Sequence, residues 1–172
     1  MNASTLLYDY FDESARKYPE KEALLFGDQR YTYSEIYRRV NILAEFLVQL
    51  GLKRQDRVVI YMDNSPELVI SFYAAMKAGG IFAIINSTVQ LQKFSYIIGD
   101  STPAVVITDV SKQHIVYEAL NQNQHSSSII WTGKSDQMPE NTHDLPEYAW
   151  NSIFTLDALN AGDDEPLNIA RN

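Results

Sequence analysis

The chain has no cysteine, which excludes disulfide bonds, thiol catalysis and thiolate metal sites together. It has no run of about eighteen apolar residues, the length that a membrane-spanning helix needs. The N-terminal stretch "MNASTLLYDYFDESARKYPEK" lacks the basic flank and apolar stretch of a secretory signal. We therefore expect no transmembrane span and a cytoplasmic location.

Basic residues are scarce in the second part of the chain. Up to Arg57 there are nine acidic and nine basic residues, whereas thirteen acidic residues face five basic ones from Val58 onward. Because a nucleic-acid-binding surface is normally a cluster of basic residues, this class of function is disfavoured. With 45% hydrophobic residues in a chain of 172, a substantial core is expected.

The first fifty residues predict a helix, a hairpin and a second helix. An apolar stripe precedes Pro19, which favours a short amphipathic helix, and "EALLF" and "RYTY" predict two strands joined by a tight turn at "GDQ". In "SEIYRRVNILAEFLVQLG", Ser34 is the expected N-cap and Gly51 the C-terminal stop. The first stripe consists of Leu6, Leu7, Tyr10, Phe11 and Ala15, and the second of Ile36, Val40, Leu43, Ala44, Leu47 and Leu50.

Apolar strands and helices then alternate. "DRVVIYM", "IFAII", "PAVVIT" and "SSIIW" lack polar alternation, which is typical of buried parallel strands. Helices are expected over "SPELVISFYAAMKAG", with Ser65 as N-cap and Pro66 at its first position, over "VQLQKFSYIIGD" and over "SKQHIVYEALNQ". The predicted fold class is α/β: a doubly wound, mostly parallel sheet with helices on both faces, plus a short N-terminal β-hairpin.

The pattern changes after Trp131. Residues 132–152, "TGKSDQMPENTHDLPEYAWNS", are polar and contain two prolines, so a long surface loop is predicted, followed by one short helix over 153–162. We expect residues 1–132 to form an α/β subdomain and residues 133–172 to form a polar loop and an incomplete connection to a missing remainder.

No catalytic motif is complete. "GKS" at 133–135 ends like a phosphate-binding loop, but Ser128 stands where that loop needs its first glycine. The three histidines are too far apart for a helical ligand pair, and the serines show no nucleophile elbow. The sequence therefore assigns no catalytic residue and no metal site.

Three segments together resemble the N-terminal part of the adenylate-forming superfamily, which comprises acyl-CoA synthetases, peptide-synthetase adenylation domains and luciferases. They are "YTYSEI", "DRVVIYMDNSPELVISFYAAMKAGG" and "SYIIGDSTPAVVIT", in an order and spacing that match over about residues 6–109. "INSTVQLQKFSYII" is more similar to the "NPxxxxxEL" segment of acyl-CoA synthetases than to "PIDPxYPxER" of peptide synthetases, although Ser87 replaces the usual proline and no acid occupies the glutamate position.

The resemblance implies a two-step ligase. Such enzymes join a carboxylic acid to ATP, with Mg²⁺, as an acyl-adenylate, and then pass the acyl group to the thiol of CoA or of an acyl carrier protein. The family's phosphate loop would be expected after Asn172, so we expect this chain alone to be inactive. The alternatives are an amino-acid-activating adenylation domain and a stand-alone α/β binding or interaction module; a phosphate loop in the reading frame beyond Asn172 would favour a ligase.

One stretch of the chain is a candidate for ligand contact. In CoA-using relatives the segment after the "IFAII" strand lies near the nucleotide end of CoA, which implies a cofactor-binding role for Asn86, Ser87 and Thr88. Some relatives have an arginine at the place of Thr88, and threonine cannot supply that charge to a phosphate. The structural alternative is that Ser87 or Thr88 caps the next helix. For "MKAGG" we expect a structural role, in which glycine ends a helix and permits positive φ.

Overall fold

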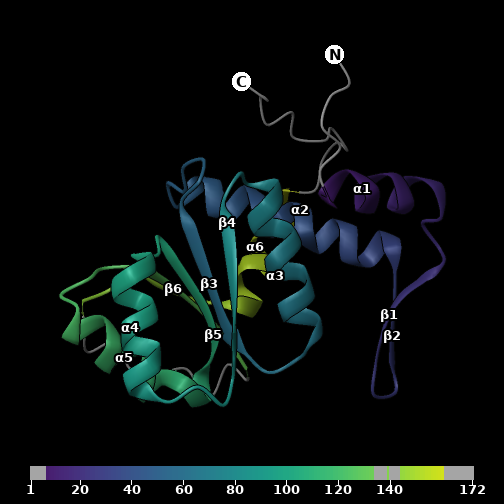
Figure 1. The fold of residues 1–172 in the computed structure, drawn as a ribbon. Coiled ribbons are helices and arrows are strands. Elements are labelled where there is room, and N and C mark those ends of the chain that lie inside the picture. The colour runs from purple at the N-terminus through teal and green to yellow at the C-terminus, as the bar shows by residue number, and fades with distance from the viewer. Residues whose placement is uncertain (1–6, 134–138, 140–143, 161–172) are drawn as a thin grey trace.

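Five parallel strands form the sheet at the centre of the molecule (Figure 1). The computed structural model describes residues 7–133, 139 and 144–160, with side chains as far as Thr155 in the last helix. The strand order is β4-β3-β5-β6-β7, and every neighbouring pair is parallel. The strands are β3 (Arg57–Met62), β4 (Ile81–Asn86), β5 (Val105–Asp109), β6 (Ser128–Thr132) and β7 (Glu147–Ala149).

Helices cover both faces of the sheet, which confirms the predicted fold class. On one face, α2 (Tyr33–Gln49), α3 (Pro66–Lys77) and α6 (Trp150–Asn160) share a core with Val58 and Ile60 of β3. On the other face, α4 (Leu91–Ser101) and α5 (Gln113–Gln122), which follows the 3₁₀ turn η1 (Val110–Lys112), share a core with Val59 and Tyr61. Alternate residues of one strand therefore serve two cores, because successive side chains point to opposite faces. None of the described helices is long and apolar enough to cross a membrane.

The N-terminal hairpin stands apart from the sheet (Figure 1). Strands β1 (Glu22–Phe26) and β2 (Gln29–Thr32) pair antiparallel, and Gly27 takes φ +58° at the turn. Leu25 and Phe26 are exposed. The prediction of a hairpin is confirmed.

Helix α1 (Leu7–Lys17) packs on α2 and α3 through a narrower stripe than the sequence predicts. Phe11 and Ala15 are buried, and the ring of Phe11 stacks on Tyr73 of α3 with centroids 4.2 Å apart. Leu7 and Tyr10 are exposed, so the stripe is wrong at these two positions. Its main contacts are with the helices α2 and α3.

Capping signals were predicted correctly for α3. For α2 the C-terminal stop at Gly51, which takes φ +88°, was predicted correctly and the N-cap wrongly. Ser65 Oγ accepts a hydrogen bond from the Leu68 amide at 3.2 Å, Pro66 begins the helix, and Gly79 takes φ +83° after its end. The N-cap of α2 is Thr32, not Ser34: Thr32 accepts from the Glu35 amide, and Glu35 accepts from the Thr32 amide at 2.8 Å. This reciprocal capping box satisfies two backbone donors, which a cap at Ser34 would not do here.

Strand β4 is less buried than its apolar sequence predicts. In the described part of the chain it is an edge strand, with β3 as its neighbour. Ile81 and Ile84 remain 51% and 46% exposed. A continuous apolar run indicates burial of the two faces but does not determine a strand's place in the sheet order.

The prediction of a loop over 132–152 is wrong for the residues from Glu147 onward. Glu147–Ala149 form β7, and α6 begins at Trp150, three residues before the predicted helix. Glu147 accepts hydrogen bonds from Tyr117 Oη at 2.9 and 3.0 Å and from Trp131 Nε1 at 2.8 Å. Burial, and then the bond to Glu147, raise the pKa of Tyr117. One carboxylate thus connects α5, β6 and β7.

We expect Glu147→Ala to lower the free energy of unfolding by about 2 kcal/mol, because it leaves the donors of Tyr117 and Trp131 without this acceptor. Urea denaturation followed by circular dichroism measures the change. Glu147→Gln retains a carbonyl acceptor and should lose less. Equal urea midpoints for Glu147→Ala and the native chain would contradict the role of this carboxylate.

Candidate functional site

The segment predicted to contact a ligand lies at the carboxyl end of β4. Asn86 is the last residue of the strand, and Ser87 and Thr88 follow it. Asn86 and Thr88 are exposed, whereas Ser87 is half-buried. Ligands of open α/β sheets bind beyond the carboxyl ends of the strands, so these residues have the right place in the fold for a binding role.

Hydrogen bonds within the segment fold it into a tight turn. Asn86 Oδ1 accepts from the Thr88 amide at 2.9 Å and from Thr88 Oγ1 at 2.8 Å. The N-cap of α4 is Gln90, which makes no side-chain cap bond. The expectation that Ser87 or Thr88 caps this helix is therefore wrong: α4 begins only at Leu91, and the amide and hydroxyl of Thr88 bond back to Asn86.

Residues at the end of β3, the strand beside β4, form hydrogen bonds with this turn. Tyr61 Oη donates to the carbonyl of Val89 at 2.6 Å, and its ring stacks on Phe94 with centroids 4.3 Å apart. Ser87 Oγ donates to Asp63 Oδ1. Burial, and then the charge of Asp63, raise the pKa of Tyr61, so its hydroxyl keeps its proton and remains a donor at neutral pH.

Lys112, which follows β5, also contacts this turn. Lys112 lies in η1, just after β5, and its Nζ donates to the Ser87 carbonyl at 2.9 Å. The same ammonium lies 5.6 Å from the centroid of the Tyr61 ring, within the range of a cation–π contact. The ammonium of Lys112 therefore lies beside the turn. It provides a positive charge there, which the uncharged Thr88 does not.

The cluster of Tyr61, Asp63, Asn86–Thr88 and Lys112 combines one cation, one carboxylate and several hydroxyl and amide groups. These groups can bind and orient a polar ligand by hydrogen bonds. Sequence reasoning identified Asn86–Thr88 and missed Tyr61, Asp63 and Lys112. Asp63 and Lys112 follow neighbouring strands, and the rule that carboxyl ends of parallel strands meet at one edge could have found them.

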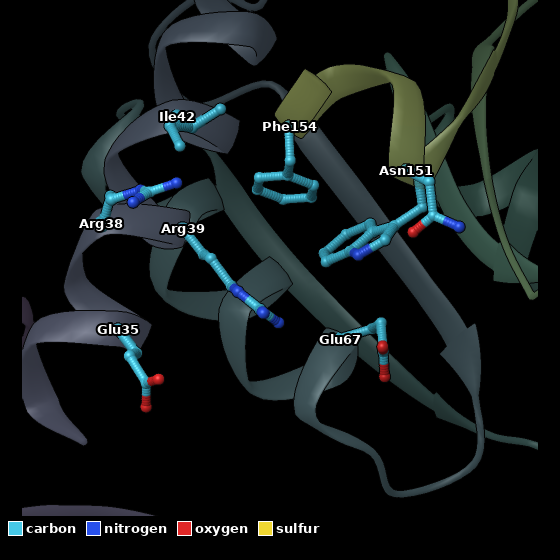
Figure 2. A pocket seen from close by; sticks show the side chains of 8 residues that line it. Glu35, Arg38, Arg39, Ile42, Glu67, Asn151 and Phe154 are labelled. Carbon is cyan, nitrogen blue, oxygen red and sulfur yellow. The ribbon is translucent and has the colours of Figure 1, made fainter. Parts of the chain in front are cut away.

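A hollow lies elsewhere, where the N-terminal parts of α2, α3 and α6 approach one another (Figure 2). It has a volume of about 320 Å³. Figure 2 shows Arg39 extending from α2 toward the side where Glu67 lies, with Phe154 of α6 above it. The lining residues are Glu35, Arg38, Arg39, Ile42, Glu67, Trp150, Asn151 and Phe154. Sequence reasoning missed this hollow, because α6 was not predicted to start at Trp150.

The remaining candidates show no arrangement for chemistry. His114 is exposed, and His125 Nε2 lies 2.8 Å from the carbonyl of Pro103. His143 and two residues of "GKS", Lys134 and Ser135, lie outside the described residues. Within the described part of the chain, no three histidine or acidic side chains are grouped so that they could hold a metal ion.

The family model for AMP-binding enzymes matches residues 11–168, nearly the whole chain. Among curated proteins, the chain is 31% identical to tyrocidine synthase 1 of Brevibacillus parabrevis over 65% of its own length. It is 32% identical to bacitracin synthase 3 of Bacillus licheniformis over 69% of its length.

Solved structures share the fold at lower sequence identity. An anthranilate CoA ligase in complex with anthranoyl-AMP superposes with a TM-score of 0.76 at 21% identity over 87% of this chain. Coronafacic acid ligase from Pectobacterium brasiliense gives 0.77 at 16% identity over 96%. Likeness at these identities shows the fold.

The chain therefore belongs to the AMP-binding enzyme family, and the resemblance to adenylate-forming ligases is confirmed. It spans only part of its relatives: 10% of tyrocidine synthase 1, 2% of bacitracin synthase 3, and 27% and 30% of the two solved chains.

Replacing Tyr61 with phenylalanine should loosen the turn after β4. The loss of one hydrogen bond to the Val89 carbonyl should cost about 1 kcal/mol and speed amide hydrogen exchange between Asn86 and Gln90, which NMR measures. Tyr96→Phe, at a side chain 72% exposed on α4, is the matched control. Unchanged exchange in Tyr61→Phe would show that the turn holds without this bond.

Proposed function

We propose that the chain is the N-terminal part of an ATP-dependent ligase that activates a carboxylic acid as an acyl-adenylate and transfers the acyl group to a thiol. The observation that carries the proposal is the family match over residues 11–168, supported by an α/β fold shared with acid–CoA ligases. Activation exchanges a poor leaving group for AMP, which makes the acyl carbon reactive toward the thiol of CoA or of a carrier protein.

The class of acid has two candidates that share this first step. The "INSTVQLQKFSYII" segment favours an acyl or fatty acid and a CoA or carrier ligase. The second candidate is an amino acid, the substrate of the peptide-synthetase branch of the superfamily. Tyrocidine synthase 1 and bacitracin synthase 3 favour it, since they are named as synthases and not as CoA ligases. An assay with both classes of acid separates the two.

The proposed contribution of this chain is a scaffold and one wall of the path for the thiol nucleotide. Asn86, Ser87 and Thr88 would line that wall, and Thr88 Oγ1 and the Asn86 amide group are exposed enough to hydrogen-bond a ligand. Lys112, held beside Ser87, would supply the positive charge that a phosphate needs. Asp63 accepts a hydrogen bond from the Ser87 hydroxyl and so fixes the orientation of that side chain.

ATP and Mg²⁺ are assigned to no residue here. Magnesium prefers oxygen ligands such as carboxylates, and the described residues present no group of three acidic or histidine side chains for it. We propose that these contacts come from sequence beyond Asn172. When bound, the metal would neutralise charge on the phosphates during adenylate formation.

Carboxylate-dependent exchange of pyrophosphate into ATP tests the proposal. A protein that extends through the reading frame past Asn172 should catalyse the exchange with at least one acid from a panel of fatty, aromatic and amino acids. The 172-residue chain alone should show none. No exchange by the extended protein with any acid would favour a non-catalytic α/β binding module. Exchange by the 172-residue chain would contradict the proposal that the contacts to ATP and Mg²⁺ come from sequence beyond Asn172.

In the same extended protein, Lys112→Ala should raise KM for CoA about tenfold, the effect of losing about 1.4 kcal/mol of binding. The exchange reaction, which does not involve the thiol, should keep its rate. Lys112→Arg retains the charge and should restore most of the affinity. An unchanged KM for CoA in Lys112→Ala would show that Lys112 does not contact the thiol nucleotide.

A further inference from the structure

The 3₁₀ turn η1 carries Lys112, and residues outside the candidate site determine where this turn lies. Lys112 Nζ donates to the Ser87 carbonyl at 2.9 Å and lies 5.6 Å from the centroid of the Tyr61 ring. An ammonium has three donors, so the bond to Ser87 leaves donors for a ligand. Because a lysine stem is flexible, the place of these donors depends on the backbone of η1 and on the contacts that hold it.

Asp109 closes η1 at its start. It is the last residue of β5 and the N-cap of η1, and its Oδ1 accepts a hydrogen bond from the Ser111 amide at 2.9 Å. At the other end of the turn, the Gln113 amide donates to the Val110 carbonyl. Without the side chain of Asp109, the Ser111 amide would lose its acceptor, and the turn that carries Lys112 would be less well fixed.

Gly133, which follows β6, lies against the same turn. Its φ is +117°, a conformation that residues with a side chain rarely adopt. A Cβ atom at this position would lie 2.8 Å from Val110 Cγ2 and 3.4 Å from Asp109 Oδ2. Val110 is buried and β-branched, so its side chain cannot rotate freely away from the contact. A methyl group at Gly133 would therefore displace η1.

Two buried threonines fix the strand ends beneath this turn. Thr132 Oγ1 donates to the Thr108 carbonyl at 3.3 Å, and Thr108 Oγ1 donates to the Tyr61 carbonyl at 2.6 Å. These bonds join the ends of β6, β5 and β3, in addition to the backbone pairing of the strands. The position of Gly133 relative to η1 is therefore determined by the sheet.

We propose that Asp109 and Gly133 are positioning residues, which hold η1 so that the Lys112 ammonium lies beside the turn after β4. Asp109 acts through the backbone of η1, and Gly133 acts by leaving room for Val110. Neither of them contacts the ligand in this proposal. Its consequence for CoA rests on the proposed function, in which Lys112 provides positive charge to a phosphate.

The charge of Asp109 and its hydrogen bond have opposite effects on the binding of an anion. A carboxylate repels a phosphate, so a role through charge alone predicts tighter CoA binding in both Asp109→Ala and Asp109→Asn. A positioning role predicts weaker binding in Asp109→Ala. Asparagine retains an acceptor for the Ser111 amide and is as good an N-cap as aspartate, so Asp109→Asn should keep the turn. The two variants therefore separate the two roles.

NMR of the 172-residue chain tests the positioning of Lys112 without any ligand. The methylene protons next to the ammonium should be shifted by the ring current of Tyr61, and their absence in Lys112→Arg assigns them. Asp109→Ala and Gly133→Ala should move these signals toward the values of an exposed lysine. Asp109→Asn should leave them in place.

The chain offers a matched control for each substitution. Gly51 also has a positive φ, +88°, but a Cβ atom there would meet no atom within 4 Å. Gly51→Ala thus adds the same backbone strain without the contact with Val110, and it should leave the Lys112 signals unchanged. Asp100→Ala removes an exposed carboxylate from α4 and should also leave them unchanged. Circular dichroism checks that each variant is folded.

The KM for CoA, measured with the protein extended past Asn172, supplies the second readout. It should rise about fivefold in Asp109→Ala and in Gly133→Ala, less than in Lys112→Ala, because the ammonium is displaced and not removed. In Asp109→Asn the KM for CoA should not rise. An unchanged KM in Lys112→Ala would contradict the proposed function alone, since the NMR signals measure the position of Lys112 without CoA.

Three results would each overturn the positioning role. The first is an unchanged set of Lys112 signals in Asp109→Ala. The second is a change in Asp109→Asn as large as that in Asp109→Ala, which would show that the charge matters and the hydrogen bond does not. The third is the same Lys112 signals in Gly133→Ala as in Gly51→Ala.

Discussion

Strand β3 is buried on both faces, and this burial determines how the other strands and helices are arranged around it. Val58 and Ile60 are fully buried under α2 and α3, and Val59 and Tyr61 are fully buried against the α4 and α5 side. A strand used in this way needs neighbours on both flanks and helices on both faces. The two cores, the parallel pairing with β4 and β5, and the positions of the crossover helices all follow from it.

The same strand connects the core to the candidate site. Tyr61 is buried through its ring, yet its hydroxyl reaches the turn after β4 and donates to Val89. Asp63, which follows β3, and Lys112, which follows β5, both contact Ser87. The turn is therefore held by hydrogen bonds on the side of the protein and exposed at Asn86 and Thr88.

Elements whose ends are determined by neighbouring residues could be predicted from the sequence, whereas elements that depend on distant residues could not. Ser65 followed by Pro66 and Glu67 is a strong helix start, and α3 begins as predicted. At α2 two hydroxyl residues compete, and the reciprocal bond between Thr32 and Glu35 decides in favour of the earlier one. Strand β7 was missed because its three residues are only half-buried and depend on Glu147, whose partners lie far away in sequence.

Only the part of the candidate site that lies in one continuous segment could be predicted from the sequence. Asn86–Thr88 came from a resemblance within one continuous segment, whereas Tyr61 and Lys112 join them only through the tertiary structure. The place of β4 at an edge also depends on strand order, which no single segment encodes. Sequence periodicity determines which faces are buried, and the contacts among strand ends require the fold.

A direct test of the central claim, that this chain is the scaffold of an adenylate-forming ligase, is the binding of a non-hydrolysable acyl-adenylate analogue, measured by calorimetry. We expect a protein extended past Asn172 to bind an analogue of its own acid more tightly than the free acid, and the 172-residue chain to bind neither. Failure of the extended protein to bind any analogue from the acyl and aminoacyl series would show that the chain is not part of such a ligase.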